Sequence, residues 1–146
     1  MNDANFYEKL KSFALDITEI PASVWVYFMT RIRIQYVRKG SFLFKEGEPS
    51  QIIGFIAKGL IYTFYQNSEG KERVKNFAWE GRLVSPWVSI LENKLPTFSA
   101  VALEPTYVVI LDGRHLKEFQ RRHVCWERLS RICTEKILSE REKRER

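Results

Sequence analysis

The sequence has no apolar run long enough to cross a membrane. Its longest nearly apolar stretch, from Ile52 to Tyr65, is interrupted by Lys58 and is shorter than the roughly 20 residues that a membrane-spanning helix needs. The first residues, MNDANFYEKL, are polar and mildly acidic, so they lack the apolar region of a secretory signal. These absences argue against a membrane partner and against secretion.

Cysteine and histidine are also scarce. The 146 residues include two cysteines, Cys125 and Cys133, and two histidines, His115 and His123. Two cysteines do not make a disulfide framework, so we expect a chain that works in a reducing cytoplasm. Because both histidines fall in the C-terminal segment, the strands lack the histidine cluster that metal-dependent β-roll enzymes need.

The remaining reactive side chains do not form a recognisable catalytic or metal-binding pattern. His123, Cys125 and Cys133 could in principle ligate zinc or an iron–sulfur cluster, but the two cysteines lie on about the same face of a predicted helix, which favours apolar packing. No Ser–His–Asp arrangement is discernible. We therefore expect no metal site and no enzyme.

Positive charge is concentrated at the C-terminal end. Residues 114–146 carry eleven Lys and Arg against six Glu, whereas residues 1–113 carry thirteen against twelve acidic residues, within a total of +6. A basic end can contact nucleic acid or a membrane surface. The terminal SEREKRER alternates in sign, however, which is typical of a solvated helix with Glu–Arg pairs.

What the chain does have is apolar periodicity. With 45% apolar and 14% aromatic residues, it is expected to fold as one domain. Helical spacing predicts a short helix over residues 6–13 and a second one over residues 23–30, with Pro21 in its first turn. The pattern then alternates, with Ile32, Ile34 and Tyr36 on one face of a strand.

Closely spaced turns and short strands follow. The turns contain Gly40, Gly47, Gly59, Gly70 and Gly81, and the β-rich runs between and after them are SFLF, IIGFIA, LIYTFY, RVKNFAW and TYVVIL. Many short strands with regular turns predict a jelly roll, so the fold class is mainly β with flanking helices.

From Asp112, a predicted N-cap, the period is helical again. GRHLKEFQRR predicts one helix and VCWERLSRICTEKILSEREKRER a longer one. We therefore divide the chain into an N-terminal helical cap with a β-roll, 1–113, and C-terminal helices, 114–146, in one structural unit.

The segment VRKGSFLFKEGEPSQIIGFIAKGLIYTFYQNSEGKE, followed by NFAWEGRLV, resembles the cyclic-nucleotide-binding domain of the Crp–Fnr transcription regulators. The similarity runs from about Arg33 to the end of the last predicted helix. It implies a double-stranded β-helix (jelly roll) and a long C-terminal helix that forms a homodimer. It also implies a helix-turn-helix domain that contacts DNA and follows this helix. Because the sequence stops at EKRER without a C-cap glycine, we expect the native protein to continue past Arg146 into that domain.

The resemblance also places a phosphate-binding cassette, which in the family reads Gly-Glu-Leu, a short helix, and Arg-Ser/Thr-Ala. Its first part falls on Ser85, Pro86 and Trp87, and its Arg-Ser pair falls on Pro96 and Thr97, or one place further on if the break is counted differently. The family's Arg neutralises the phosphate and its Glu binds the ribose, and this sequence has neither at these positions. We therefore expect a cyclic nucleotide to bind weakly or not at all, unless Arg73 or Arg82 replaces the missing Arg.

The effector itself is not identifiable from the sequence. Thr63, Trp87 and Phe98 suit a flat or apolar molecule, or the two rings simply fill the core. The candidate pocket residues are Thr63, Arg73, Arg82, Leu83, Ser85, Trp87, Thr97, Phe98 and Ser99.

The last predicted helix carries an apolar seam. The resemblance makes this seam the dimer contact and puts a polar residue from the range 139–141 near the effector; alternatively, the helix folds back onto its own roll. The seam residues are Trp126, Leu129, Ile132, Cys133 and Ile137.

We conclude from the sequence that the chain is the ligand-sensing and dimerisation domain of a Crp–Fnr-type regulator. The alternatives are a dimerisation module that needs no ligand, and non-specific nucleic-acid binding through the basic helix.

Overall fold

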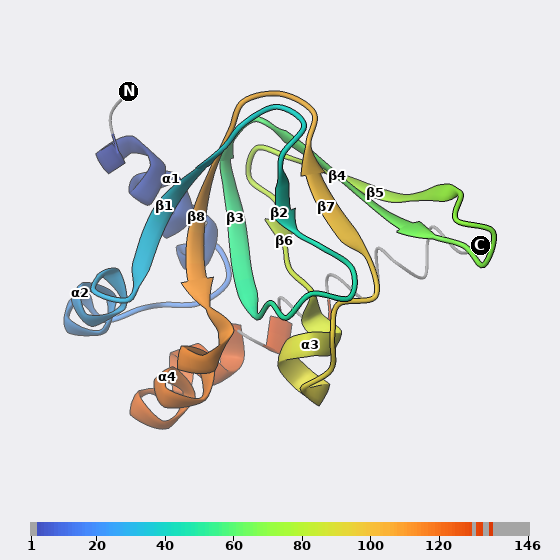
Figure 1. The fold of residues 1–146 in the computed structure, drawn as a ribbon. Helices are drawn as coiled ribbons and strands as arrows, with labels where there is room; N and C mark the ends of the chain where they lie inside the picture. The colour runs from blue at the N-terminus through green and yellow to red at the C-terminus, as the bar shows by residue number, and fades with distance from the viewer. Residues whose placement is uncertain (1–2, 130, 133–134, 136–146) are drawn as a thin grey trace.

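The computed structural model describes residues 3–129, 131, 132 and 135 (Figure 1). Its helices are α1 (Asp3–Leu15), α2 (Ala22–Met29), α3 (Trp87–Glu92) and α4 (Leu116–Arg122), with a 3₁₀ turn η1 at Gly113–His115. Residues 124–129 are also helical. None of the helices in this described part of the chain is long and apolar enough to span a membrane.

Eight strands form two antiparallel sheets. The strands are β1 (Ile32–Val37), β2 (Phe42–Phe44), β3 (Ile52–Lys58), β4 (Leu60–Gln66), β5 (Glu72–Trp79), β6 (Leu83–Val84), β7 (Ser99–Ala102) and β8 (Thr106–Asp112). Sheet 1 has the order β1-β8-β3-β6, and sheet 2 has the order β2-β7-β4-β5. Figure 1 shows α1 and α2 beside sheet 1, α4 below the end of β8, α3 below β6, and the β4–β5 hairpin extending away as an arm.

Strand β8 separates two hydrophobic cores, because successive side chains of a strand point to opposite faces. Val108 and Ile110 pack between the two sheets, in what we call the inter-sheet core. Val109 and Leu111 pack on the other face against the helices, in what we call the helical core. Residues Phe119 and Trp126 belong to the helical core, so the C-terminal helices cover the same face of sheet 1 as α1 and α2.

Of the predicted fold class, the structure confirms two four-stranded antiparallel sheets with flanking helices. Of the predicted long C-terminal helix, residues 124–129 are helical, and most of the remainder lies outside the described residues. Both predicted N-terminal helices are present, although Pro21 is the N-cap of α2 and not part of its first turn. The five predicted turn glycines all have positive φ. Gly59 has a second constraint, since a Cβ there would lie 2.4 Å from the hydroxyl oxygen of Thr106.

Candidate functional site

The phosphate-binding cassette begins at the end of β6, where the chain continues through Ser85 and Pro86 into α3. The Ser85 hydroxyl donates a hydrogen bond to the carbonyl of Ile52 in β3, at 2.8 Å, and Ser85 is buried. Pro86 is fully buried and has no backbone N–H to donate. Asn93 ends α3 in the left-handed region, with φ of 56°. The entry of α3 is therefore held by internal contacts and presents no carboxylate.

The return from α3 to β7 is tied to the loop after β2. The Pro96 carbonyl accepts from the Gly47 N–H at 3.0 Å, and the Ser99 hydroxyl accepts from the Glu46 N–H at 2.8 Å. Pro96 and Ser99 are buried, whereas Thr97 between them is exposed. Of the predicted pocket residues on this segment, Thr97 thus reaches solvent and Ser99 is committed to the backbone.

Phe98 brings the cassette into contact with sheet 2. Its ring meets Phe44 edge to face, with centroids 5.2 Å apart. The amino group of Lys75, on β5, lies 3.7 Å from the Phe98 ring centroid, a cation–π contact. Thr63 is buried on β4, and its hydroxyl donates to the Asn76 carbonyl at 3.3 Å. Phe98 therefore packs against the core, and Lys75 is a cation beside the cassette that the sequence analysis did not single out.

The two arginines that could replace the family's Arg lie on β5 and just after it. Arg73 is exposed and pairs with Tyr65 in the β4–β5 ladder. The guanidinium carbon of Arg82 lies 4.2 Å from the ring centroid of Trp79. Arg82 is thus stacked on an aromatic ring at the β5 side of the cassette.

The residues present do not fit a cyclic nucleotide in the way the resemblance implies. Where the family has a Glu for the ribose, Pro86 is buried, and where it has an Arg for the phosphate, Pro96 is buried. Removing one partner of a buried charge pair costs about 2–5 kcal/mol, or roughly one and a half to four decades of affinity.

Two predicted pocket residues, Leu83 and Trp87, lie toward the helices. Both line an apolar cavity of about 80 Å³ on the helix-facing side of sheet 1, together with Ala14, Val109 and Trp126. The indole Nε1 of Trp87 is buried without a hydrogen-bond partner. The cavity could not be predicted from the sequence, because residues distant along the chain enclose it.

Helix α3 also contacts the start of the C-terminal helices. The Gln51 carbonyl accepts from the Gly113 N–H at 2.6 Å, and the Gln51 side chain donates to the Ser89 carbonyl at 3.2 Å. A Cβ on Gly113 would lie 2.9 Å from the Ile90 side chain. The cassette helix and the β8–α4 junction are therefore in close contact, with no room for a larger residue at Gly113.

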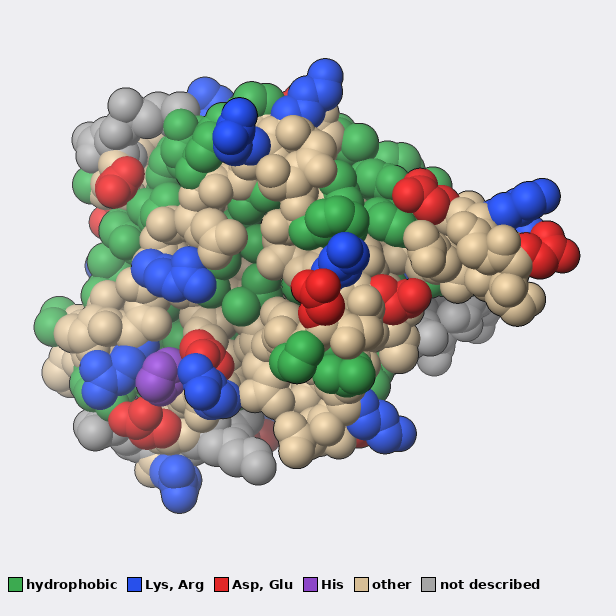
Figure 2. Space-filling view, in the orientation of Figure 1, with side chains coloured by type: hydrophobic (Ala, Val, Ile, Leu, Met, Phe, Trp, Pro, Cys, Tyr) green, Lys and Arg blue, Asp and Glu red, His purple; other side chains and the backbone are tan. Residues whose placement is uncertain are grey.

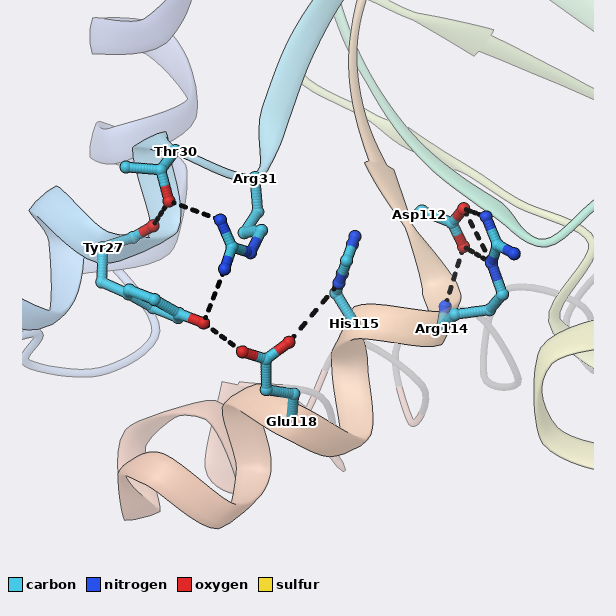
Figure 3. Close-up of polar contacts among 7 residues, drawn as sticks. All are labelled: Tyr27, Thr30, Arg31, Asp112, Arg114, His115 and Glu118. Carbon is cyan, nitrogen blue, oxygen red and sulfur yellow. Dashed lines mark hydrogen bonds and ion pairs between the residues drawn. The ribbon is translucent and has the colours of Figure 1, made fainter.

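A polar network joins α4 to α2 (Figure 3). The Tyr27 hydroxyl donates to the Glu118 carboxylate, and Arg31 donates to the Tyr27 hydroxyl at 3.2 Å. His115 Nδ1 lies 3.5 Å from the other Glu118 oxygen. The network therefore connects an N-terminal helix, α2, to a C-terminal helix, α4.

Asp112 caps the η1 turn, as predicted. Its carboxylate accepts from the Arg114 N–H at 2.9 Å and pairs with the Arg114 guanidinium at 2.6 Å (Figure 3). The hydrogen bonds from Arg114 lower the pKa of Asp112, because they favour the charged carboxylate.

The residues of the predicted dimer seam do not share one environment. Trp126 is buried in the helical core, with its ring centroid 4.6 Å from that of Phe28, so it packs within its own chain as the folded-back alternative requires. Leu129 and Ile132 are half-buried. Cys133, Ile137 and the range 139–141 lie outside the described residues.

Among the residues that the structure describes, no group of three or more His, Cys, Asp or Glu is arranged to hold a metal ion. Burial raises the pKa of the Cys125 thiol, so the thiol stays protonated at neutral pH and is a poor nucleophile or ligand. Cys125 therefore contributes apolar packing to the helical core.

Solved structures with this fold include several sensor domains. A cyclic nucleotide-binding domain from Methylobacillus flagellatus has a TM-score of 0.81 at 15% identity, covering 95% of this chain and 79% of that one. The sensor domain of the transcriptional regulator DNR from Pseudomonas aeruginosa has a TM-score of 0.72 at 15% identity, covering 94% and 89%. The catabolite activator protein of Thermus thermophilus has a TM-score of 0.72 at 20% identity; the match covers 86% of this chain and only 58% of that protein.

The sequence comparison gives the family. No curated protein is similar enough to this chain to count as a match. Residues 34–123, more than half of the chain, match the family model of the cyclic nucleotide-binding domain. These residues include both sheets apart from the start of β1, together with α3, η1 and α4. The chain therefore belongs to the cyclic nucleotide-binding domain family, with the fold found in sensor domains of Crp–Fnr-type regulators.

Proposed function

We propose that this chain is the effector-sensing and dimerisation domain of a Crp–Fnr-type transcription regulator. The observation that carries the proposal is the contact between the cassette and the C-terminal helices. Ile90 of α3 lies against Gly113, at the junction with α4, and Trp87 of α3 lines the same cavity as Trp126 and Leu129. A change in the cassette is thereby transmitted to the helical layer.

The mechanism is a shift between two arrangements of roll and helices. An effector that binds one arrangement better than the other changes their populations by its difference in affinity. The tight contact at Gly113 favours a discrete change, because a packed junction does not deform continuously.

The effector is not cyclic AMP in this proposal. Pro86 and Pro96 stand where the family's Glu and Arg would be, and both are buried. Thr97, exposed on the cassette, follows Pro96, and Lys75 of β5 lies against Phe98.

The proposed dimer contact uses Leu129 and Ile132, because Trp126 is occupied within its own chain. Leu129→Asp puts a charge into that contact and yields monomers in sedimentation velocity. An exposed helical position nearby, Val124→Asp, is the matched control and leaves assembly unchanged. A wild-type chain that is monomeric at high micromolar concentration contradicts the proposed contact.

DNA recognition belongs to a helix-turn-helix domain that the resemblance places after this chain. This chain alone is proposed to bind no operator specifically, and any DNA affinity it has falls steeply with salt. Tight, salt-resistant and sequence-selective binding in a gel-shift titration contradicts this part and supports nucleic-acid binding through the basic helix.

A dimerisation module that needs no ligand is the second candidate. The internal hydrogen bond of Ser85 and the burial of Pro86 favour it, because they hold the entry of the cassette without an effector.

Amide NMR spectra recorded across a panel of nucleotides and small metabolites separate the two candidates. The sensor proposal expects one ligand class to shift residues of α3 and residues 124–129 together. It also expects Gly113→Ala, which crowds Ile90, to shift both segments without a ligand. If every ligand leaves residues 124–129 unmoved, the sensor proposal fails and the ligand-independent module stands.

A further inference from the structure

Aromatic side chains cover the outer face of sheet 2, the face that points away from the inter-sheet core. Ile61 and Ala78 belong to that core, so the residues that alternate with them on β4 and β5 point outward. Phe42 and Phe77 are each 43% exposed, and Trp79 is 48% exposed. Adjoining exposed apolar side chains mark interaction sites. We call this surface the aromatic face, and its members are Phe42, Leu60, Tyr62, Phe77, Trp79 and Val101.

The rings of the aromatic face form a continuous row. Strand register aligns one residue from each of the four strands across the sheet, namely Phe42, Val101, Tyr62 and Phe77. The ring centroids of Tyr62 and Phe77 are 6.3 Å apart, and the buried Phe64 ring lies 5.1 Å from Tyr62 and 6.4 Å from Phe42. Since neighbouring strands are about 4.8 Å apart, the row is roughly 14 Å long.

A cation lies against a ring at each side of this face. The Lys45 amino group lies 5.2 Å from the ring centroid of Phe42, on the β2 side. The Arg82 guanidinium carbon lies 4.2 Å from the ring centroid of Trp79, on the β5 side. The face therefore combines planar apolar surface with positive charge at both of its ends.

Charge also decides between two kinds of occupant. A second copy of this chain, packed face to face, would bring the Lys45 and Arg82 of the two copies together, so like charges would meet. A polyanion instead meets a cation at either end. Two nearby carboxylates have partners within the chain: Glu72 accepts from the Tyr62 hydroxyl at 3.1 Å, and Glu80 pairs with a lysine of α1.

We propose that the aromatic face binds a single-stranded nucleic acid. Its bases stack on Phe42, Phe77 and Trp79, and its phosphates lie near the two cations at the ends of the face. Base–aromatic stacking is tolerant of sequence, because every base has a π-face. A four-stranded sheet with exposed rings accommodates two or three stacked bases, which matches the length of the row.

This binding goes beyond the proposed regulatory function. The aromatic face lies on the opposite side of sheet 2 from the inter-sheet core, and its members belong neither to the cassette nor to residues 124–129. Binding here therefore needs no effector and no helix-turn-helix domain. It also differs from binding through the basic C-terminal helix, because rings carry it together with charge.

Strands of equal length and charge separate stacking from electrostatic attraction. The probes are twelve-nucleotide (dT)12 and (rU)12, within the roughly 4–16 nucleotides of single-strand sites, and an abasic strand with the same number of phosphates. Fluorescence anisotropy of the labelled strands at low salt reports binding to the full chain. We expect dissociation constants on the order of 1–100 μM for the strands with bases, about 10-fold or more below that of the abasic strand. Binding of neither (dT)12 nor (rU)12, or equal affinity for the abasic strand, overturns the proposal.

Two rings of equal exposure test the position. Phe77→Ala removes a ring of the aromatic face, whereas Tyr65→Ala removes a ring that is also 43% exposed but follows Phe64 and so points to the other side of β4. The first variant should weaken (dT)12 binding about 5-fold or more, the loss expected for one stacked base, and the second should leave it unchanged. If Phe77→Ala does not fold, Trp79→Leu replaces it. Equal losses in the face and control variants, or no loss in either, overturn the assigned face.

Arg82→Gln tests the charge at the β5 side. Loss of one phosphate contact should reduce the slope of log affinity against log salt concentration by about 0.7. An unchanged slope overturns the role of Arg82.

Sedimentation velocity tests the other occupant, a second copy of the chain. Wild type and Phe77→Ala are expected to show the same state of assembly. A dimer that is lost in Phe77→Ala assigns the face to a second copy and overturns the proposal. Leu129→Asp, which tests the proposed helical dimer contact, should leave (dT)12 binding unchanged, so failure of the two proposals is distinguishable.

Discussion

The two faces of sheet 1 differ in how completely they are packed. Between the sheets, Val108 and Ile110 are 0% and 2% exposed, and a Cβ on Gly54 would lie 2.8 Å from the Val108 side chain. On the helical face, Val109 and Leu111 pack among aromatic rings and border a cavity of about 80 Å³. The same strand thus has one closely packed face and one face that borders a cavity.

The side chains explain this difference. The inter-sheet core consists mainly of Val, Ile and Ala side chains, which interdigitate between the two sheets. The helical core brings large rigid rings such as Phe28, Phe119 and Trp126 together from separate elements. The cavity therefore lies on the helical face of sheet 1, whereas the buried Ser85 and Pro86 occupy the entry of α3. On the side shown in Figure 2, hydrophobic side chains also reach the surface over the base of the β4–β5 arm, with charged side chains toward its tip.

The largest effect on the free energy of unfolding is expected from truncating two neighbouring side chains of β8, Ile110 and Leu111. Ile110→Ala should lower the free energy of unfolding by about 2–5 kcal/mol, because it opens a void in a closed core. Leu111→Ala deletes as many carbon atoms but borders the cavity, where fewer contacts are lost, so it should cost less. Urea denaturation of both variants measures the difference, and equal or reversed costs would show that the two cores are packed alike.

Adding a methylene at neighbouring positions should give effects of opposite sign. Val108→Ile overfills the inter-sheet core and should cost about 1–3 kcal/mol. Val109→Ile extends into the cavity and should stabilise by up to about 1 kcal/mol. Thermal unfolding checks both variants, and a destabilising Val109→Ile would indicate that the cavity cannot accept even a methyl group.

A smaller effect on the free energy of unfolding is expected at Asp112, where β8 ends. Asp112→Ala removes the cap of η1 and should cost about 1 kcal/mol, whereas Asp112→Asn keeps a capping side chain and should cost less. Since the folded-state pKa of Asp112 is lowered, its ionic contribution is present above the ordinary value of 3.8 and is lost as pH falls through the folded-state value. The stability gap between wild type and Asp112→Asn, followed by denaturation from neutral to acid pH, should therefore close below pH 3.8. A gap that stays constant would leave capping as the only role of Asp112.

The fold was largely predictable from the sequence because its signals are local. Turn glycines, strand alternation and the Asp112 cap act within a few residues, and the structure confirms them. The surroundings of Trp126 could not be predicted from such local signals, since its spacing suits both a dimer seam and packing on the same chain. Only the contact with Phe28, almost a hundred positions earlier, identifies its surroundings.

The site was less predictable, because its contacts join residues that lie far apart in the sequence. The absence of the family's Glu and Arg from their positions in the cassette is visible in the sequence, but the orientation of Trp87 toward the helices is not. The contact of Lys75 with Phe98 and that of Ile90 with Gly113 depend on strand register and helix packing. Their spacing along the chain carries no signal that could have indicated them.

Calorimetric titration of the chain with cyclic AMP tests the central claim most directly. If the cassette lacks the groups that hold a cyclic phosphate, heat changes should stay unsaturated at ligand concentrations well above about 10 μM, given the affinity lost with the missing Arg. A saturable isotherm with a dissociation constant below about 10 μM would contradict the account. It would show that another cation of the roll, such as Lys75 or Arg82, takes the place of that Arg.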